Sequence, residues 1–201
     1  ISTNENSQLN PFNDYGKSKL KAEAHLSAWA NKEINRSLII IRLTAVFGEG
    51  NRGNIYNLIN QINKDMFILI GNGNNKKSIA YVGNLVKFIS FLLDSKPGEH
   101  IYNYADKPDL TIHEIITIIH AVLKKKTRRY KIPFWLGICF GYVCDMISIL
   151  FSKELLFSSI RMKKFCANSI ISTKKLESLN LISNHTIQEA LAMTIKNDFM
   201  K

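Results

Sequence analysis

Two patterns of apolar residues alternate along the chain and predict its fold class. Ser37 to Leu43 (SLIIIRL) is a continuous β-branched run of the kind found in buried parallel strands. A second strand is predicted from His100 to Tyr104, and a shorter one from Met66 to Ile70. Stretches with helical periodicity separate these runs. The sequence therefore predicts an α/β fold with parallel strand pairing.

Polar capping residues predict where the helices begin and end. A Ser, Thr, Asp or Asn before an apolar stripe marks a helix start, and a Glu three residues later completes a capping box. These signals predict helices from about Asn13 to Asn31, from Ile55 to Asn63, from an Asn84 cap through Leu93, and after the capping boxes Thr111/Glu114 and Thr186/Glu189.

Residues 133–151 (PFWLGICFGYVCDMISILF) are almost uniformly apolar and carry one charge, Asp145. The segment is long enough to span a bilayer. Its two glycines and Asp145 favour a buried or half-buried helix, with an interfacial helix and a spanning helix as the other interpretations. From Pro133 onward the pattern is mainly helical, which indicates a smaller C-terminal subdomain.

The net charge of +11 comes from basic residues that gather in clusters: Lys76–Lys77, Lys124–Arg129 and Arg161–Lys164. Such clusters are ordinary solvated surface, or they bind an anionic small ligand, an anionic membrane face or nucleic acid. The sequence has no zinc-finger spacing and no RNP-like aromatic motif, so nucleic acid is not expected as a partner.

Three cysteines are present, and none forms a CxxC pair. An odd count without such spacing argues against a disulfide framework and against a structural metal, and it fits a reducing compartment. The polar start (ISTNENSQLN) does not read as a signal peptide. A chain that opens with Ile in a polar loop is expected to be a processed product or a fragment.

Tyr15 and Lys19 are the candidates for catalysis. They are four residues apart on a predicted helix, so their side chains share one face. An ammonium group beside a phenol favours the phenolate, and such a pair can act as a general acid/base at a sugar or alcohol hydroxyl. The same spacing also occurs on ordinary helix surfaces, so the surrounding sequence has to decide.

That surrounding sequence resembles the extended short-chain dehydrogenase/reductase family, which includes NAD-dependent nucleotide-sugar epimerases and dehydratases. NPFNDYGKSKLKAEAHL is similar to the family's active-site helix P-x-x-x-Y-G-x-S-K-x-x-x-E, through Pro11, Tyr15, Gly16, Ser18, Lys19 and Glu23. Three further segments follow in the family's order: IIIRLTAVFGEGNRGN, IGNGNNKKSIAYVGNLVKFI and HIYNYADKPDLTIHEI. The resemblance covers most of residues 10–125, and SSIRMKKFCANSIISTKKLESL is more faintly similar to the late phosphate-binding region.

The resemblance implies a role for each matching residue. Tyr15 would be the catalytic acid/base, and Lys19 would bind the nicotinamide ribose. The residues implied at the cofactor are Tyr15, Lys19, Leu43, Thr44 and Val46. The residues implied at the substrate diphosphate are Asn54, at a helix start that suits anions, Lys77 and Arg161. Plain surface charge is the alternative interpretation of Lys77 and Arg161.

The resemblance also implies an incomplete Rossmann-like parallel sheet with a smaller, mainly helical C-terminal substrate-binding subdomain. Residues 1–50 would be the end of the NAD-binding domain. Residues 51–201 would be the substrate-binding region, with 78–105 returning partly to the core sheet. Two family features are missing from the sequence: the glycine-rich G-x-x-G-x-x-G fingerprint, and the catalytic Ser/Thr, which would lie upstream of Ile1.

The implied activity is C4 epimerisation of a UDP-linked sugar for surface-polysaccharide synthesis, with NAD as cofactor and NADP left open. Four alternatives to this activity remain. They are a 4,6-dehydratase, a 4-keto reductase, a membrane-surface enzyme that acts on a polyprenyl-linked sugar, and a non-catalytic truncated fragment. The fragment alone is expected to be inactive. The expected location is cytoplasmic, or at the inner membrane face with peripheral membrane contact. A homodimer is a further expectation from the resemblance.

Overall fold

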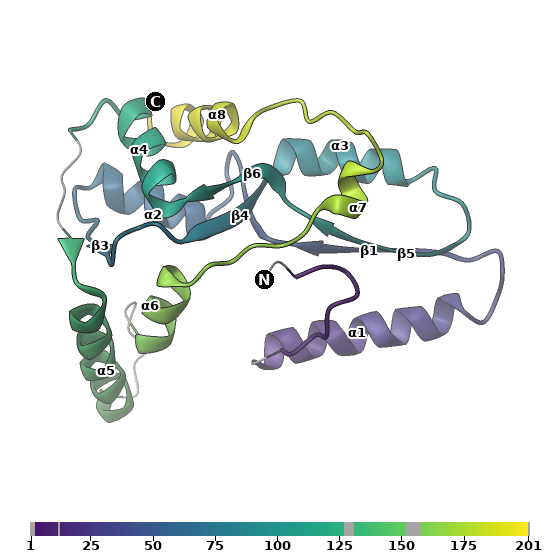
Figure 1. Cartoon of the computed structure of the whole chain (residues 1–201), viewed down its shortest axis with the longest axis horizontal. Helices are drawn as coiled ribbons and strands as arrows, with labels where there is room; N and C mark the ends of the chain where they lie inside the picture. The colour runs from purple at the N-terminus through teal and green to yellow at the C-terminus, as the bar shows by residue number, and fades with distance from the viewer. Residues whose placement is uncertain (1–2, 12, 127–130, 152–157, 201) are drawn as a thin grey trace.

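The computed structural model describes residues 3–11, 13–126, 131–151 and 158–200. Strands and helices alternate in the first part of the chain, and the last part is mainly helical (Figure 1). In chain order the elements are α1 (Asp14–Ala30), β1 (Ser37–Leu43), β2 (Ala45–Phe47), α2 (Asn54–Asn63), β3 (Leu69–Ile70), β4 (Lys76–Tyr81), α3 (Val82–Leu92), β5 (Gly98–Tyr104), β6 (Asp106–Thr111), α4 (Ile112–Val122), β7 (Lys131–Ile132), α5 (Phe134–Phe151), α6 (Ser159–Cys166), α7 (Lys174–Glu177) and α8 (Ile187–Phe199).

The strands β1 and β5 form a parallel pair that is covered by a helix on each face. Leu38 and Ile40 of β1 pack with the end of α1, whereas Ile39 and Ile41 pack with α3. Successive side chains of a strand point to opposite faces, so a continuous apolar run is what a strand between two helices requires. Figure 1 shows α3 and α1 on opposite sides of this pair. The predicted strand Ser37–Leu43 is thereby confirmed.

A second group of strands departs from the predicted parallel pairing. Strand β4 pairs in parallel with β2 but antiparallel with β6. The sequence patterns predicted neither β4 nor β6, because KKSIAY begins with two lysines and DKPDLT contains a proline and two aspartates, which read as a turn. The strand predicted from Met66 is also shorter, since only Leu69 and Ile70 pair, with β7.

Helices α2, α4 and α8 enclose a core over this second group of strands. Both predicted capping boxes are confirmed. In α4 the Thr111 hydroxyl accepts from the Glu114 N–H at 3.1 Å, and the Glu114 carboxylate accepts from the Thr111 N–H at 2.7 Å. Thr186 and Glu189 repeat the arrangement at the start of α8.

The predicted cap at Asn84 is wrong. Helix α3 starts at Val82, and Asn84 lies inside it, buried. The Asn84 amide donates to Asp106 at 3.0 Å and to the His185 carbonyl at 2.8 Å. Its oxygen accepts the N–H groups of Asn184 and His185. A tertiary contact with the segment before α8 therefore uses a polar residue that reads locally as a cap.

The carboxylates of the two capping boxes are expected to make the stability of the fold depend on pH in the acid range. Hydrogen bonds from the backbone N–H groups of Thr111 and Thr186 lower the pKa of Glu114 and Glu189 below their ordinary value of 4.5. A lowered pKa contributes stability that is present above the ordinary value and is lost as the pH falls through the lowered one. As the pH falls from 4.5 through the lowered pKa values, the melting temperature of the complete protein should fall. We expect it to fall less in the double variant Glu114→Gln/Glu189→Gln than in the unmodified protein.

The matched control is Asp94→Asn, which changes an exposed carboxylate. Melting curves recorded from neutral pH into that acid window provide the comparison. An unchanged acid dependence in the double variant would show that the two capping boxes contribute nothing to it.

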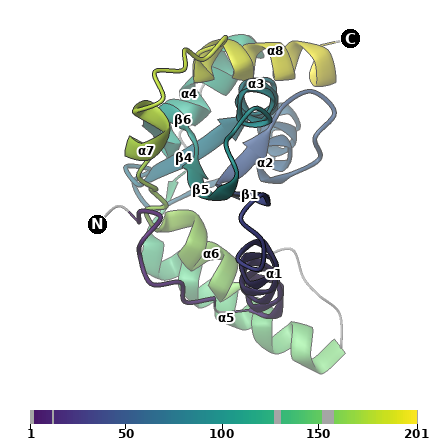
Figure 2. The ribbon, with the colours of Figure 1, turned by 90° about the vertical axis from the view of Figure 1, so that its right-hand side faces the viewer.

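Within the apolar segment 133–151, residues 134–151 form α5, which packs mainly against α6 and extends away from the sheets (Figures 1 and 2). In the part of the chain that the structure describes, no helix is long and apolar enough to cross a membrane. Of the preferred expectation, a buried or half-buried helix, the half-buried form agrees with the structure: one face of α5 is buried, whereas Trp135 and Met146 on the other are 66% and 72% exposed. Where burial is described in α5, which is residues 134–148, the buried residues are Gly137, Gly141 and Cys144.

Candidate functional site

Tyr15 and Lys19 lie on one face of α1, as the spacing predicts. Asn13 caps this helix, since its side chain accepts the Gly16 N–H at 2.9 Å, and Tyr15 therefore sits in the first turn. The Lys19 ammonium lies 5.4 Å from the centre of the Tyr15 ring. Tyr15 is 71% exposed. Within the described residues, neither side chain hydrogen-bonds to another group, so both are available to a ligand.

An ion pair between Glu23 and Arg42 sets the rotation of α1. Glu23 lies one turn beyond Lys19, on the same stripe of the helix. The Arg42 guanidinium donates to the Glu23 carboxylate at 2.7 Å and to the Glu5 carbonyl at 2.9 Å. The pair is largely shielded from water and holds the stripe towards the end of β1. Sequence reasoning missed this contact, although a Glu on a helix and an Arg ending a buried strand were its signals.

The predicted cofactor residues all lie towards the carboxyl end of β1. Helix α1 runs antiparallel to β1, so its first turn lies towards this end of the strand (Figure 1). Leu43 ends β1 half exposed, and the Thr44 hydroxyl donates weakly to the Tyr104 carbonyl at 3.4 Å. Val46 follows on β2. Ligands of open α/β sheets bind at the carboxyl ends of the strands, so this placement suits a bound nucleotide.

The donors at this end fit part of a dinucleotide. An uncommitted ammonium on Lys19 and a phenol on Tyr15 can both hydrogen-bond a ribose diol. The pyrophosphate requires a glycine-rich turn before a helix, and this sequence does not contain that motif. The residues present therefore fit the nicotinamide-ribose end of the cofactor.

Asn54 opens α2 beside β2. The helix is capped by Gly53 without a side-chain hydrogen bond, so no cap side chain occupies its first N–H groups. A Cβ on Gly53 would lie 3.7 Å from the Val46 carbonyl oxygen, which places the helix start next to β2. Val46 pairs with Ala80 of β4, and Lys77 lies three residues earlier on the same strand.

Lys77 is attached to the helix that carries Arg161. Its ammonium donates to the carbonyls of Lys164 and Ala167 at 2.8 and 2.7 Å, at the end of α6. Burial lowers the pKa of Lys77. Arg161 is exposed in the first turn of the same helix. The structure thus joins two of the three predicted substrate segments, and the shared diphosphate site remains a prediction.

We expect Arg161→Ala in the complete protein to weaken binding of a sugar diphosphate by about tenfold or more, because a charge-assisted hydrogen bond is lost. The loss should shrink as salt rises, since salt screens the charges. Calorimetric titration at two salt concentrations measures it. Lys32→Ala, which removes an exposed cation beyond the far end of α1, is the control. If both variants bind the sugar diphosphate with equal affinity, Arg161 is an ordinary surface charge and not part of the substrate site.

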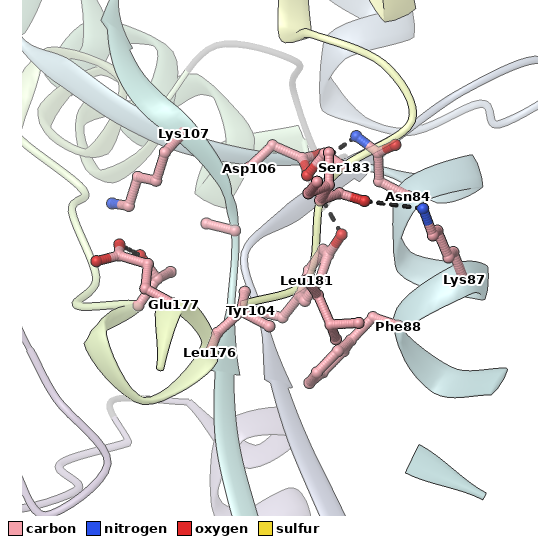
Figure 3. A pocket seen from close by; sticks show the side chains of 13 residues that line it. Asn84, Lys87, Phe88, Tyr104, Asp106, Lys107, Leu176, Glu177, Leu181 and Ser183 are labelled. Atoms are coloured by element: carbon pink, nitrogen blue, oxygen red, sulfur yellow. Dashed lines mark hydrogen bonds between the residues drawn. The ribbon is translucent and has the colours of Figure 1, made fainter. Parts of the chain in front are cut away.

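A separate pocket of about 140 Å³ lies between α3, the β5–β6 junction and the segment around α7 (Figure 3). Its lysines already have partners: Lys87 donates to the Ile182 carbonyl at 2.8 Å, and Lys107 donates to Asp109. None of the residues predicted for the site lines it. We therefore place the candidate site at the carboxyl end of β1.

Residues 1–105 match the NAD dependent epimerase/dehydratase family. The chain belongs to this family, as the resemblance of its motifs predicted. Members of this family bind NAD.

Two curated relatives define the similarity further. An N-acetyl-alpha-D-glucosaminyl-diphospho-ditrans,octacis-undecaprenol 4-epimerase of Escherichia coli O157:H7 is 42% identical over 198 residues, which are 98% of this chain and 60% of the relative. A UDP-glucose 4-epimerase of Vibrio cholerae is 32% identical over 133 residues, which are 65% of this chain and 40% of the relative. The chain therefore spans well under two thirds of the length of either relative.

Solved structures show the same fold. The UDP-glucose 4-epimerase of Thermotoga maritima aligns with a TM-score of 0.69 at 14% identity, over 98% of this chain and 57% of that one. The UDP-N-acetylglucosamine 4-epimerase of Bacillus cereus aligns with a TM-score of 0.68 at 16% identity, over 98% and 59%. The structure is thus an α/β chain that aligns with part of the epimerase fold.

Proposed function

We propose that the complete protein is an NAD-dependent 4-epimerase of a sugar joined to a diphosphate. The observation that carries this proposal is the pair Tyr15–Lys19, whose side chains have no hydrogen-bond partner among the described residues. The pair lies on a helix that the Glu23–Arg42 ion pair attaches to the end of β1. Membership of the epimerase/dehydratase family and the 4-epimerase names of both curated relatives support it. Residues 1–50 would close the cofactor domain, and residues 51–201 would form the substrate region.

NAD, when bound, supplies the oxidant at C4 of the sugar and returns the reducing equivalents, so the reaction has no net redox change. Tyr15 would take the proton of the 4-hydroxyl group and later give it back to the oxygen of the inverted centre. Lys19 would hydrogen-bond the ribose through its ammonium group. Asn54, Lys77 and Arg161 would bind the diphosphate, so that the non-reacting part of the substrate positions the sugar.

Two carriers of the sugar are candidates. A UDP-linked sugar agrees with the Vibrio cholerae relative and with the sequence motifs. A polyprenyl diphosphate agrees with the Escherichia coli relative, whose similarity covers 98% of the chain and so extends through α5 and α6. The exposed apolar side chains of α5 are the specific observation that favours the polyprenyl carrier, since a lipid-linked substrate lies at a membrane.

The test is turnover by the complete protein. UDP-glucose, UDP-N-acetylglucosamine and N-acetylglucosaminyl-diphospho-undecaprenol are each incubated with the enzyme and NAD, and the sugars are identified by NMR. We expect the 4-epimer of at least one substrate, without net consumption of cofactor. A 4-keto-6-deoxy product would identify a dehydratase, and a 4-keto sugar formed with stoichiometric reduction of NAD would identify a reductase that runs in reverse. No product from any of them would contradict the proposal.

Residues 1–201 alone should not bind NAD with micromolar affinity. The glycine-rich turn that holds the pyrophosphate is not among them, and only the ribose end of the cofactor has donors here. Calorimetric titration of NAD into this chain and into the complete protein measures the difference. Equal affinities would show that these residues bind the cofactor without that motif.

A further inference from the structure

Helix α5 has its small residues inside and its large apolar residues outside. Gly137, Gly141 and Cys144 are buried at a spacing of one helical face. Its exposed apolar side chains include Trp135, Phe140, Tyr142, Val143, Met146 and Ile147. A surface helix in water has the reverse arrangement, with its large apolar residues against the core. An exposed apolar area of this kind marks an interaction site.

Close packing determines which way this helix faces. A Cβ on Gly141 would lie 2.8 Å from the backbone of Ser159 on α6, and a Cβ on Gly137 would lie 2.6 Å from the Ile70 side chain. Nothing larger than glycine fits at either point without movement. The backbone of α5 is therefore pressed against the protein along this stripe, and its opposite face has to point away.

The one charged residue of α5 is turned inward. The Asp145 carboxylate accepts the Ser159 N–H at 3.1 Å, at the first turn of α6. A carboxylate at a helix N-terminus is favourable, because it complements the free N–H groups and the helix dipole. Asp145 thus leaves the outward face of α5 without charge.

The sequence on both sides of this helix is strongly basic. Residues 124–167 contain ten Lys or Arg and two Asp or Glu, which is a net charge of +8 out of +11 for the whole chain. Of this group, Arg128, Arg129, Lys153 and Glu154 lie outside the described residues. Among the described ones, Lys163 of α6 donates to the Tyr142 hydroxyl at 2.9 Å and lies 5.1 Å from the centre of its ring. A cation therefore stands at the edge of the apolar face.

We propose that the outward face of α5 docks on an anionic membrane surface. Apolar side chains at the headgroup boundary, with cations beside lipid phosphates, are the complement of such a bilayer. Bilayer docking also agrees with the finding that no helix in the described ranges could cross a membrane. The helix would lie in the interface, with Trp135 and Met146 among the inserted side chains.

Docking would bring the candidate catalytic end to the membrane. Figures 1 and 2 both show α1, α5 and α6 on the same side of the β1–β5 pair. A sugar diphosphate that projects from a bilayer would then approach from the side on which Tyr15 lies. The functional purpose of docking rests on the proposal that the sugar is carried by a polyprenyl diphosphate. Docking itself can be measured without turnover.

Vesicle flotation of the complete protein tests the proposal. The vesicles contain phosphatidylcholine, either alone or with phosphatidylglycerol. We expect co-flotation with the anionic vesicles, and a loss of about tenfold or more when added salt screens the cations. The variant Trp135→Glu/Met146→Glu should lose about tenfold or more in partitioning, because it puts charge into the apolar boundary. The matched control Ile34→Glu/Leu93→Glu places charge at two exposed apolar positions elsewhere and should float like the unmodified protein.

Tryptophan fluorescence locates the contact. A blue shift on adding anionic vesicles should be present in the unmodified protein and reduced in Trp135→Phe, which still floats. Equal binding to neutral and anionic vesicles, or equal loss in the control variant, would overturn the proposal. So would a lipid-free dimer that Trp135→Glu/Met146→Glu converts to monomers, since the face would then join two copies. Absence of flotation under all conditions would overturn it as well.

The proposed function and the docking proposal fail separately. Flotation without epimerase activity on any substrate would leave docking standing and reject the epimerase. Epimerase activity on UDP-sugars without flotation would reject docking and leave the epimerase.

Discussion

Replacing Tyr15 with Phe in the complete protein is expected to lower kcat by about 100-fold or more, which is the usual effect of removing a general acid/base. The variant removes one hydroxyl group from an exposed side chain that no described residue holds, so the fold should not change. Binding of the sugar diphosphate should be spared, because its proposed contacts are Asn54, Lys77 and Arg161. The measurements are kcat with the substrate identified by NMR, and substrate affinity by calorimetry.

Tyr56→Phe is the matched control. Tyr56 is a partly buried tyrosine of α2, where it packs on Phe199, and it has no proposed catalytic part. We expect its kcat to stay close to that of the unmodified protein. If both variants keep full turnover, the assignment of Tyr15 as the acid/base is wrong, and another residue transfers the proton.

Replacing Asp106 with Ala should destabilise the protein by about 3 kcal/mol, because three buried donors, the Tyr81 N–H, the Asn84 amide and the Tyr104 hydroxyl, lose their acceptor. Asp106 accepts the Tyr81 N–H at 2.6 Å and the Asn84 amide at 3.0 Å, and it is 5% exposed. This carboxylate joins the end of β4 to α3 and, through Asn84, to the segment before α8. Denaturant unfolding of the complete protein measures the change, with Asp94→Ala at an exposed position as the control.

The pH dependence separates the charge of Asp106 from its volume. Burial raises the pKa of this carboxyl above 3.8, while the hydrogen bonds from Tyr81 and Asn84 partly oppose the shift. A raised pKa means that the stabilising contribution is full below the ordinary value and is lost as the pH rises through the raised one. Asp106→Asn lacks this titration, so its stability relative to the unmodified protein should increase across that window. A constant difference would show that Asp106 ionises as freely in the folded as in the unfolded state.

Local patterns alone were sufficient for the elements that decide the family. The run SLIIIRL can be buried only between two covered faces, and it forms β1 at the predicted residues. Side chains four residues apart share a helix face in any α-helix, so the proximity of Tyr15 and Lys19 followed from spacing. The Thr111 and Thr186 capping boxes form for the same reason, because all their partners lie within one turn.

Contacts between distant residues decided the rest. Strand β6 contains Pro108 and forms only because it can pair with β4. Asn84 looks like a cap until Asp106 and His185 are placed beside it. The contact of Glu23 with Arg42, and that of Lys77 with the end of α6, likewise join residues far apart in the chain.

Helix α5 shows the difference most clearly. Its composition alone permits a buried, an interfacial or a spanning helix, since apolar residues occur all around it. Tertiary packing selects the glycine stripe as the inner face, because only glycines allow the backbone of α5 to approach Ser159 and Ile70 so closely. The sequence thus determined that this segment is an apolar helix and that the neighbouring segments are rich in Lys and Arg. Only the tertiary structure decided that its large side chains point outward, because the direction of a helix face depends on what the helix packs against.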